Sequence, residues 1–299
     1  MKKFSFVFCI GIGLVACKPA TNPNADANVS SPNASTTAPS TPAPTPPKVD
    51  LSNIKHDARA VGAPKSQEQI ELEEAHQKII ADANNPKSGL GFYTGAFGTN
   101  KITLIIESIE GGKISGHSVC AGNYRTLTGT YEQIENNMYK CVLNEPGTDK
   151  YDGKFEVEIN PQSGKLTGKW APFKTGVVPA KTFELSEQSP QINLTAGLDW
   201  SSEPTAADIS RRTSTAILQE DDLFELSTEM LKMLRNEIYA RHGYCFKDKN
   251  IRAMFEKTSW YMPKSVDVRD DLSDIEVKNI DLIAQYEKYL VENADNFGR

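Results

Sequence analysis

The sequence predicts an α+β, multidomain protein, in which an antiparallel β-barrel or curved β-sheet domain is followed by a small three-helix bundle. Between residues 90 and 187, short runs of β-branched and aromatic residues alternate with turn residues. Between 223 and 295, apolar residues recur at helical spacing and capping signals flank them. Ahead of both, a segment rich in Pro, Ala, Ser and Thr lacks the apolar residues that a core requires.

The N-terminus, residues 1–16, has the features of an export signal peptide. Lys2 and Lys3 precede an apolar run over 4–15, which is too short to span a bilayer as a stable helix. The run ends in Leu-Val-Ala-Cys, which resembles the lipobox of bacterial lipoproteins. This resemblance implies cleavage before Cys17 and acylation of its thiol. An ordinary cleaved signal followed by a chance cysteine is the alternative.

Residues 17–49 are expected to form a disordered tether behind the lipidated cysteine. Fully stretched, such a segment spans about 100 Å at about 3.1 Å per residue. Lys18 follows the cysteine, and the sorting rule of enteric lipoproteins then implies the outer membrane rather than the inner membrane. We therefore expect a protein of the cell envelope that contacts a membrane through its lipid anchor.

Composition excludes several classes of function for the remaining chain of about 250 residues, which suffices for one large domain or two small ones. The formal net charge of −6 becomes about −8 once Lys2 and Lys3 are removed, which argues against nucleic acid as a partner. The histidines are scattered without metal-ligand spacing, and no glycine-rich loop precedes a helix. We expect no cofactor, no metal and no catalytic residue.

The folded part is expected to begin with a helical lead-in over 50–87, in which Ser66 and Gln69 can form a capping box. The β domain follows over 88–187. Its strands repeat an apolar–hydroxyl–glycine pattern at Ile114-Ser115-Gly116, Leu127-Thr128-Gly129 and Leu166-Thr167-Gly168. Glycine weakens a strand unless the strand bends or another backbone approaches closely, so we expect a strongly curved sheet.

Three cysteines remain once Cys9 is removed and Cys17 is acylated. An exported chain meets an oxidising compartment, which permits a disulfide. Cys120 and Cys141 lie in the same β region, so we expect them to pair. Cys245 is then left over, and we expect it to be a small buried hydrophobe.

Residues 188–222 hold few periodic apolar positions and are expected to connect the two domains. The helical domain follows over 223–299. Ser227 can cap a helix over 228–242, and Gly243 then supplies the position after the helix that needs a positive φ.

Two further helices complete the expected bundle. Asp248 can cap a short helix that ends before the Trp-Tyr-Met-Pro run at 260–263. Ser273 and Glu276 form a second capping box, and the apolar stripe behind it predicts a helix that ends near Glu292.

RNEIYARHGYCF at 235–246, followed by the 260–263 run and by DLSDIEVKNIDLIAQYEKY, resembles the YARHG domain. This small bacterial module is named for the pentapeptide at 239–243. The preceding β segment resembles the domain that often accompanies it in bacterial lipoproteins. The resemblance implies fold and location, and it carries no activity to this chain. Its motif residues here are Arg235, Asn236, Tyr239, Arg241, His242 and Gly243.

The cations of this motif allow two interpretations. At about 100° per residue, Arg235 and His242 fall on the apolar stripe of the helix, whereas Glu237 and Arg241 lie off its edge. An unpaired buried charge costs several kcal/mol, so we expect Arg235 to bind a carboxylate of the acidic segment 267–276. In the first, the cations are buried and fix the packing of the bundle; in the second, they form a cationic site for an anionic ligand. We favour the first interpretation.

The leading functional hypothesis is a non-enzymatic, membrane-anchored envelope lipoprotein that binds or scaffolds an unknown protein or glycan partner. The first alternative is an inhibitor of a cationic hydrolase such as lysozyme, which an exposed acidic loop at 145–153 on a barrel rim would favour. The second is a hydrolase acting on envelope polymers, which a pocket with paired carboxylates and a raised pKa would favour.

Overall fold

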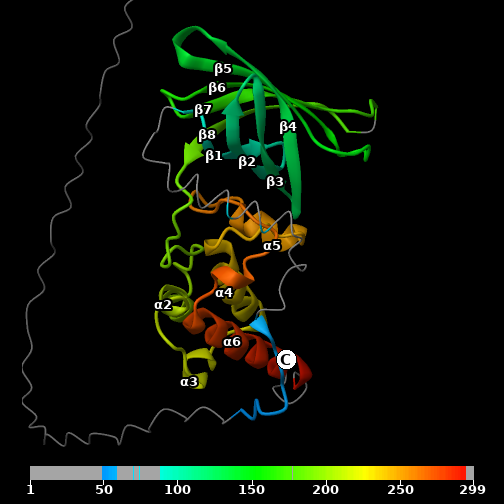
Figure 1. Ribbon diagram of the computed structural model, residues 1–299. Helices are drawn as coiled ribbons and strands as arrows, with labels where there is room; N and C mark the ends of the chain where they lie inside the picture. Colours follow the sequence, from blue (N-terminus) through cyan, green and yellow to red (C-terminus); the bar gives the residue numbers. More distant parts are fainter. Residues whose placement is uncertain (1–48, 59–69, 71–73, 75–87, 177, 294–299) are drawn as a thin grey trace, which may run out of the picture. The chain divides into compact units, whose positions relative to one another are not determined.

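The computed structural model describes residues 49–58, 70, 74, 88–176 and 178–293. They form an eight-stranded antiparallel β-barrel followed by a helical region, so the predicted α+β, multidomain class is confirmed (Figure 1). The predicted signal peptide, nearly all of the tether and most of the predicted lead-in helix lie outside the described residues.

The barrel is a closed meander in which each strand pairs with the next and β8 pairs back with β1. Closure removes the unpaired edges that an open sheet would expose. The strands are β1 (Gly91–Phe97), β2 (Asn100–Glu110), β3 (Lys113–Cys120), β4 (Asn123–Ile134), β5 (Met138–Asn144), β6 (Gly153–Asn160), β7 (Lys165–Pro172) and β8 (Lys181–Gln188).

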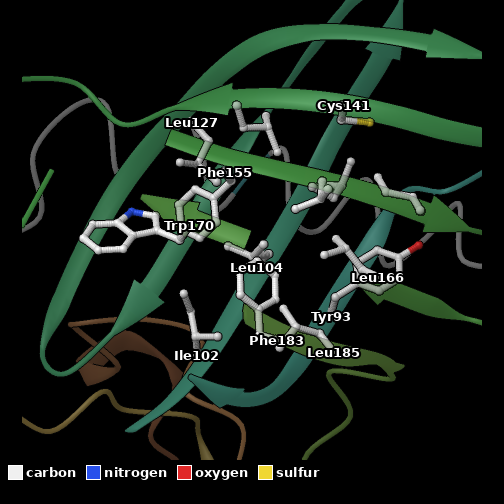
Figure 2. Packing of buried hydrophobic residues seen from close by; sticks show 14 of the residues in the cluster. Tyr93, Ile102, Leu104, Leu127, Cys141, Phe155, Leu166, Trp170, Phe183 and Leu185 are labelled. Carbon is white, nitrogen blue, oxygen red and sulfur yellow. The ribbon is translucent and has the colours of Figure 1, made fainter. Parts of the chain in front are cut away.

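One apolar cluster fills the barrel interior. Side chains alternate in and out along each strand; on β8, Phe183 and Leu185 are buried whereas Thr182 and Glu184 are exposed. Figure 2 shows this packing, in which the large side chains of several strands meet in the lumen. The cluster includes Tyr93, Ile102, Leu104, Leu127, Leu143, Phe155, Leu166 and Trp170.

The three strand-interior glycines admit close approach of a neighbouring backbone, as their pattern predicts. A Cβ added to any of them would collide with a carbonyl oxygen of the adjacent strand. The distance would be 1.9 Å at Gly116, 1.8 Å at Gly129 and 2.3 Å at Gly168. Glycine is therefore required at these points for the strands to pack in a closed barrel.

The predicted Cys120–Cys141 disulfide is wrong, because both cysteines are free thiols. In the strand register, Cys120 lies opposite Asn123 beside the β3–β4 turn, whereas Cys141 lies opposite Tyr131. Asn123 and Tyr131 lie eight positions apart on β4, which corresponds to roughly 26 Å at about 3.3 Å per residue. A disulfide requires Cα atoms within about 7 Å. Both cysteines belong to the barrel, but they lie at different heights along it.

The helical region contains α2 (Pro204–Arg212), α3 (Glu220–Leu223), α4 (Thr228–Arg241), α5 (Lys249–Phe255) and α6 (Asp274–Glu292). The predicted caps of the last three helices are confirmed. The Ser227 hydroxyl accepts from the N–H of Met230 at 3.3 Å, and Asp248 accepts from two N–H groups of α5. Ser273 and Glu276 form the reciprocal capping box of α6.

The helix α2 lies within residues 188–222, for which the sequence predicts only a connector, and α3 begins there and ends one residue beyond it. On α2, the buried apolar residues are Ala206 and Ile209. Its apolar stripe is therefore only two residues long, which is too short to predict a helix from the sequence. Both residues join an apolar cluster with Leu231 and Leu234 of α4, and the polar contacts to α4 described below add to this packing.

A small mixed cluster joins residues of the barrel to residues of the helical region. Its apolar members are Phe92, Ile105, Val119, Cys245 and Met262. The N–H of Gly122 donates to Sγ of Cys245 at 3.0 Å, and Lys101 Nζ donates to the carbonyl of Tyr261 at 2.9 Å. Cys245 is buried, as predicted.

Candidate functional site

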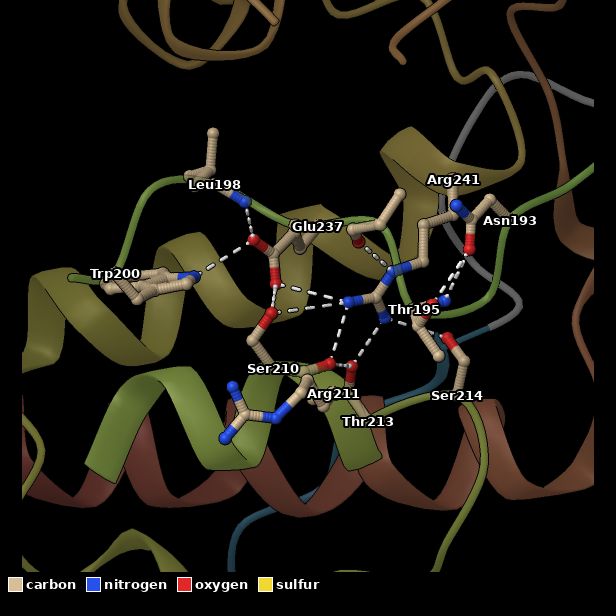
Figure 3. A network of polar contacts seen from close by, with 12 residues as sticks. Asn193, Thr195, Leu198, Trp200, Ser210, Arg211, Thr213, Ser214, Glu237 and Arg241 are labelled. Carbon is tan, nitrogen blue, oxygen red and sulfur yellow. Dashed lines mark hydrogen bonds and ion pairs between the residues drawn. The ribbon is translucent and has the colours of Figure 1, made fainter. Parts of the chain in front are cut away.

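Arg241 of α4 is fully buried, with 0 % of its side chain exposed. Its guanidinium lies beside Glu237, Ser210 and Thr213 (Figure 3). Its Nε donates to the carbonyl of Ala196 at 2.6 Å. Nη1 donates to the hydroxyls of Thr213 at 2.6 Å and Ser214 at 2.9 Å, and Nη2 donates to the carbonyl of Ser210 at 2.7 Å. A guanidinium has five N–H donors, and these contacts together with Glu237 satisfy the whole group.

Glu237, one turn earlier on α4, supplies the opposite charge and is equally buried. Its Oε2 lies 3.3 Å from Nη2 of Arg241 and accepts from the hydroxyl of Ser210 at 2.6 Å. Its Oε1 accepts from the indole of Trp200 at 3.0 Å and from the N–H of Leu198. We call these contacts of Arg241 and Glu237 the α4 network. They bind the segments 196–200 and 210–214 to α4.

Burial and charge act on Arg241 in opposite directions. Desolvation lowers the pKa of Arg241, and the negative charges of Glu237 and Glu276 raise it again. The net shift is downward, yet an arginine pKa starts so high that the group stays protonated in proteins. Arg241 therefore remains a cation inside the domain, and the domain has to supply its acceptors.

The structure reverses the predicted burial of the two arginines. The helical wheel puts Glu237 and Arg241 off the edge of the apolar stripe, but they are the buried pair, because α2 and its flanking loops cover that side of α4. Arg235 is instead partly exposed, with 18 % of its side chain accessible. A helical wheel reveals the apolar face of α4 that packs on α6. It gives no sign of the polar contact that α4 makes with α2 on another side.

Arg235 binds Glu287 of α6, with Nε 3.1 Å from Oε2. The expected partner from 267–276 is therefore wrong. The helices α4 and α6 run antiparallel, since His242 at the end of α4 meets Glu276 at the start of α6. Arg235 lies two turns earlier on α4, so it faces a later part of α6.

The residue that contacts the acidic segment 267–276 is His242, not Arg235. It is buried, and its Nε2 lies 2.9 Å from Oε1 of Glu276. The other oxygen of Glu276 accepts from the N–H of Ser273 at 2.9 Å. Desolvation pushes the pKa of Glu276 upward, but the hydrogen bond and charge of His242, with the Ser273 N–H, outweigh it, so this pKa lies below its ordinary value.

The other motif residues also contact their own chain. Asn236 Nδ2 donates to the carbonyl of Lys232 at 2.7 Å, and the Tyr239 hydroxyl donates to the carbonyl of Ala58 at 3.2 Å. Gly243 has a φ of 77°, and a Cβ there would lie 2.7 Å from the carbonyl oxygen of Met262. Its predicted role as the positive-φ residue after the helix is confirmed.

A second candidate site lies in one mouth of the barrel, where β1, β3, β5 and β7 end and the other four strands begin. A cavity of about 290 Å³ opens there. We call it the mouth cavity. Its lining is Phe97, Asn100, Ile102, Ser118, Cys120, Ala121, Asn123, Arg125, Glu145, Tyr151, Phe155, Trp170, Val178 and Lys181.

Glu145 anchors the polar side of the mouth cavity and is buried, with 6 % exposed. Its Oε1 accepts from the hydroxyl of Ser118 at 3.1 Å. Its Oε2 accepts from the indole of Trp170 at 3.0 Å and from the N–H of Gly153 at 2.9 Å. Desolvation raises the pKa of Glu145, and these hydrogen bonds together with the charge of Arg125 offset part of the rise.

Two cations reach the mouth cavity from opposite strands. Arg125 on β4 donates through Nε to Oδ1 of Asp152 at 3.2 Å and lies 3.9 Å from Glu145. Lys181 on β8 places Nζ 4.1 Å from the ring centre of Phe97 and 5.6 Å from that of Trp170. Within the described chain, no ion pair joins Lys181 to a carboxylate.

The site is absent from the sequence-based predictions above, although the strand alternation carries a signal for it. Lys181 shares the inward parity of Phe183 and Leu185, and Arg125 shares that of Leu127. A charged residue at an inward position of a barrel strand marks a polar spot in the lumen. Glu145 carries the same signal, because it directly follows β5 and continues the inward parity of Cys141 and Leu143.

Among the described residues, no group of three or more His, Cys, Asp or Glu side chains is arranged to hold a metal ion. In the same part of the chain, no helix combines the length and apolar character needed to cross a membrane.

Comparison with known proteins identifies a domain over part of the chain. Residues 207–288 match the model of the YARHG domain, a small, non-catalytic module. The match begins within α2 and so includes helices that the sequence analysis left to a connector. No curated protein and no solved structure matches this chain.

Replacing Arg241 by Met should destabilise the helical domain by about 3–5 kcal/mol, because Glu237 would remain buried without its counter-charge. Arg235→Met is the matched control, and it should cost about 1 kcal/mol, since that ion pair is partly exposed. Urea unfolding of the full chain, followed by circular dichroism, measures both. Equal losses for the two variants would contradict a central role for the α4 network.

Glu276→Gln should change how stability depends on pH. The folded pKa of Glu276 is lowered, so its contribution is present above the unfolded pKa of about 4.3 and is lost as pH falls through the folded pKa. The wild type should therefore be more stable than the variant at pH 7, and the difference should shrink as pH falls below about 4. Unfolding curves across this range test it, and a difference that stays constant would refute it.

Proposed function

We propose that this chain, which contains a YARHG domain at residues 207–288, is a non-enzymatic ligand-binding protein of the cell envelope. The mouth cavity carries the proposal. It combines aromatic and aliphatic walls with a few polar groups that hydrogen bonds hold in place. Ligand sites have this composition, and barrel mouths are among the places where they occur.

We assign the YARHG motif a structural role within this function. Every donor of Arg241 and both oxygens of Glu237 already contact the protein itself. Binding a ligand there would require breaking several buried hydrogen bonds at once. The motif residues therefore hold α2, α4 and α6 together, and we place the ligand site in the barrel.

Attachment to the envelope rests on the N-terminal sequence. We propose that Cys17 is acylated and that residues 17–49 tether the folded domains to a membrane, the outer membrane in a two-membrane cell. The order Leu-Val-Ala-Cys after an apolar run supports this, as does a following segment without the apolar residues of a core.

The inhibitor hypothesis receives less support from the loop at 145–153. Its carboxylates at Glu145 and Asp152 are buried and already bind Trp170 and Arg125. Asp149 is the acidic residue that this loop exposes. An inhibitor that recognises a cationic surface needs several free carboxylates on its rim, and this loop turns most of its own inward.

One observation favours a hydrolase as the second candidate, since Glu145 has a raised pKa and lines a cavity. A general acid must reach the bond that it protonates. Both oxygens of Glu145 are engaged by Ser118, Gly153 and Trp170, so contact with a bound molecule would require breaking at least one of these hydrogen bonds. We therefore rank binding above hydrolysis.

Filling the mouth cavity should abolish binding. Val178→Trp places a large side chain in the mouth, whereas Ile192→Trp adds the same group at an exposed position outside the barrel and serves as the control. Ligand-observed NMR with a panel of aromatic acids, alcohols, amides, esters and glycosides should find binders for the wild type and the control but not for Val178→Trp.

All panel members should also be recovered unchanged. Binding that persists in Val178→Trp would remove the mouth cavity as the site. Hydrolysis of an ester or glycoside by the wild type but not by Glu145→Gln would replace the binding function by the hydrolase.

Cys17→Ala should lose incorporation of radiolabelled palmitate and release the protein from the membrane fraction. Cys9→Ala, within the same signal, is the control and should still be labelled. Label that persists in the Cys17 variant would overturn the lipid anchor.

A further inference from the structure

We infer that the mouth cavity binds a small carboxylate with an aromatic or aliphatic body, because it places an uncompensated lysine beside an apolar wall. This assignment rests on the proposed binding function and names its ligand class. Lys181 is the principal contact of the carboxylate, and Arg125 supplies further donors from the opposite wall of the barrel.

The ammonium group of Lys181 is the first support. It points into the lumen, since Lys181 shares the inward parity of Phe183 on β8. It rests on the rings of Phe97 and Trp170 and has no ion pair or hydrogen bond with any described residue. An aromatic face attracts a cation but leaves its N–H donors without strong acceptors. An entering carboxylate would supply those acceptors.

Arg125 supplies the second support. Its contacts with Asp152 and Glu145 run through Nε. Within the part of the chain that the structure describes, its two terminal amino groups make no hydrogen bond. These two groups are the guanidinium donors that can bind a carboxylate, because Nε is already used by Asp152. Arg125 can thus contact an anion without giving up its present partner.

The negative groups beside these cations are already engaged. Glu145 accepts from Ser118, Trp170 and Gly153, and Asp152 accepts from Arg125 and from the N–H of Asp149. A cationic ligand would therefore find both carboxylates already occupied by donors of the protein. The aromatic faces that attract a cation are taken as well, since Lys181 lies over them. The cavity is thus better suited to an anion than to a cation.

The remaining wall accounts for the apolar body of the ligand. Ile102, Phe155 and Val178 line the cavity, and Tyr151 offers an exposed ring at its rim. The volume of about 290 Å³ lies at the lower end of the range for small-molecule sites. A single ring with a short acidic tail therefore fits better than a long lipid chain or a sugar polymer.

Three probes with one body and different head groups test the charge preference: 3-phenylpropionate, 3-phenylpropan-1-ol and 3-phenylpropan-1-amine. Calorimetry on the full-length protein at pH 7 should show the carboxylate binding at least about tenfold more tightly than the alcohol, the ratio that one charge-assisted contact gives. The amine should bind more weakly than either. Equal affinities, or tightest binding of the amine, would overturn the inference.

Variants then assign the preference to Lys181. Lys181→Met keeps the apolar stem and should bring the carboxylate and alcohol affinities within about twofold of each other, while alcohol binding persists. Lys181→Arg should retain the preference, and Lys140→Met, an exposed change on β5, should leave all affinities unchanged. A carboxylate preference that survives in Lys181→Met would refute the role of this residue.

The two levels of the proposal fail separately. If panel members bind in a manner that Val178→Trp abolishes, but the carboxylate has no advantage, the ligand class is wrong and the binding function stands. If neither the panel nor the three probes bind, the binding function and the ligand class are both wrong.

Discussion

The helical domain depends on one buried ion pair, Arg241 with Glu237. A guanidinium and a carboxylate removed from water cost several kcal/mol each unless every donor and acceptor finds a partner. Here the partners come from the loop at 196–200 and the segment at 210–214, which are distant in sequence from α4. The pair therefore fixes the path of the chain between the barrel and α4, because any other path would leave a charge unpaired.

This constraint explains why a short motif can dominate a small domain. A small helical core buries too little apolar surface to select one packing by hydrophobicity alone. Directional contacts complete the selection: Arg241 positions α2, His242 ties the end of α4 to the cap of α6, and Gly243 turns the chain where a side chain would collide with Met262. The motif residues are contiguous because they occupy the end of one helix, where three segments converge.

The barrel mouth uses the same chemical groups in the opposite way. In the α4 network, every polar group has its partner within the protein. In the mouth cavity, the carboxylates of Glu145 and Asp152 are engaged, while Lys181 and the terminal amino groups of Arg125 keep unused donors beside an apolar wall. A complete set of contacts indicates architecture, whereas an incomplete set next to an open volume indicates a binding site. On this basis we separate the structural part of the chain from the proposed binding part.

Local signals in the sequence determined the strands, the last three helices and several of their ends. Alternation predicted the strands, strand-interior glycines predicted close backbone approach, and Ser227, Asp248 and the Ser273–Glu276 capping box marked helix starts, because each of these acts within a few residues.

Tertiary structure decided which residues meet. The strand register places Cys120 and Cys141 at different heights of the barrel. The antiparallel packing of α4 and α6 brings Arg235 next to Glu287, and contacts with α2 bury Arg241. The mouth cavity likewise exists only once eight strands close and bring Lys181 and Arg125 to one end of the barrel. Sequence spacing cannot supply such contacts, since they depend on the relative height and direction of elements that pack side by side only in the folded chain.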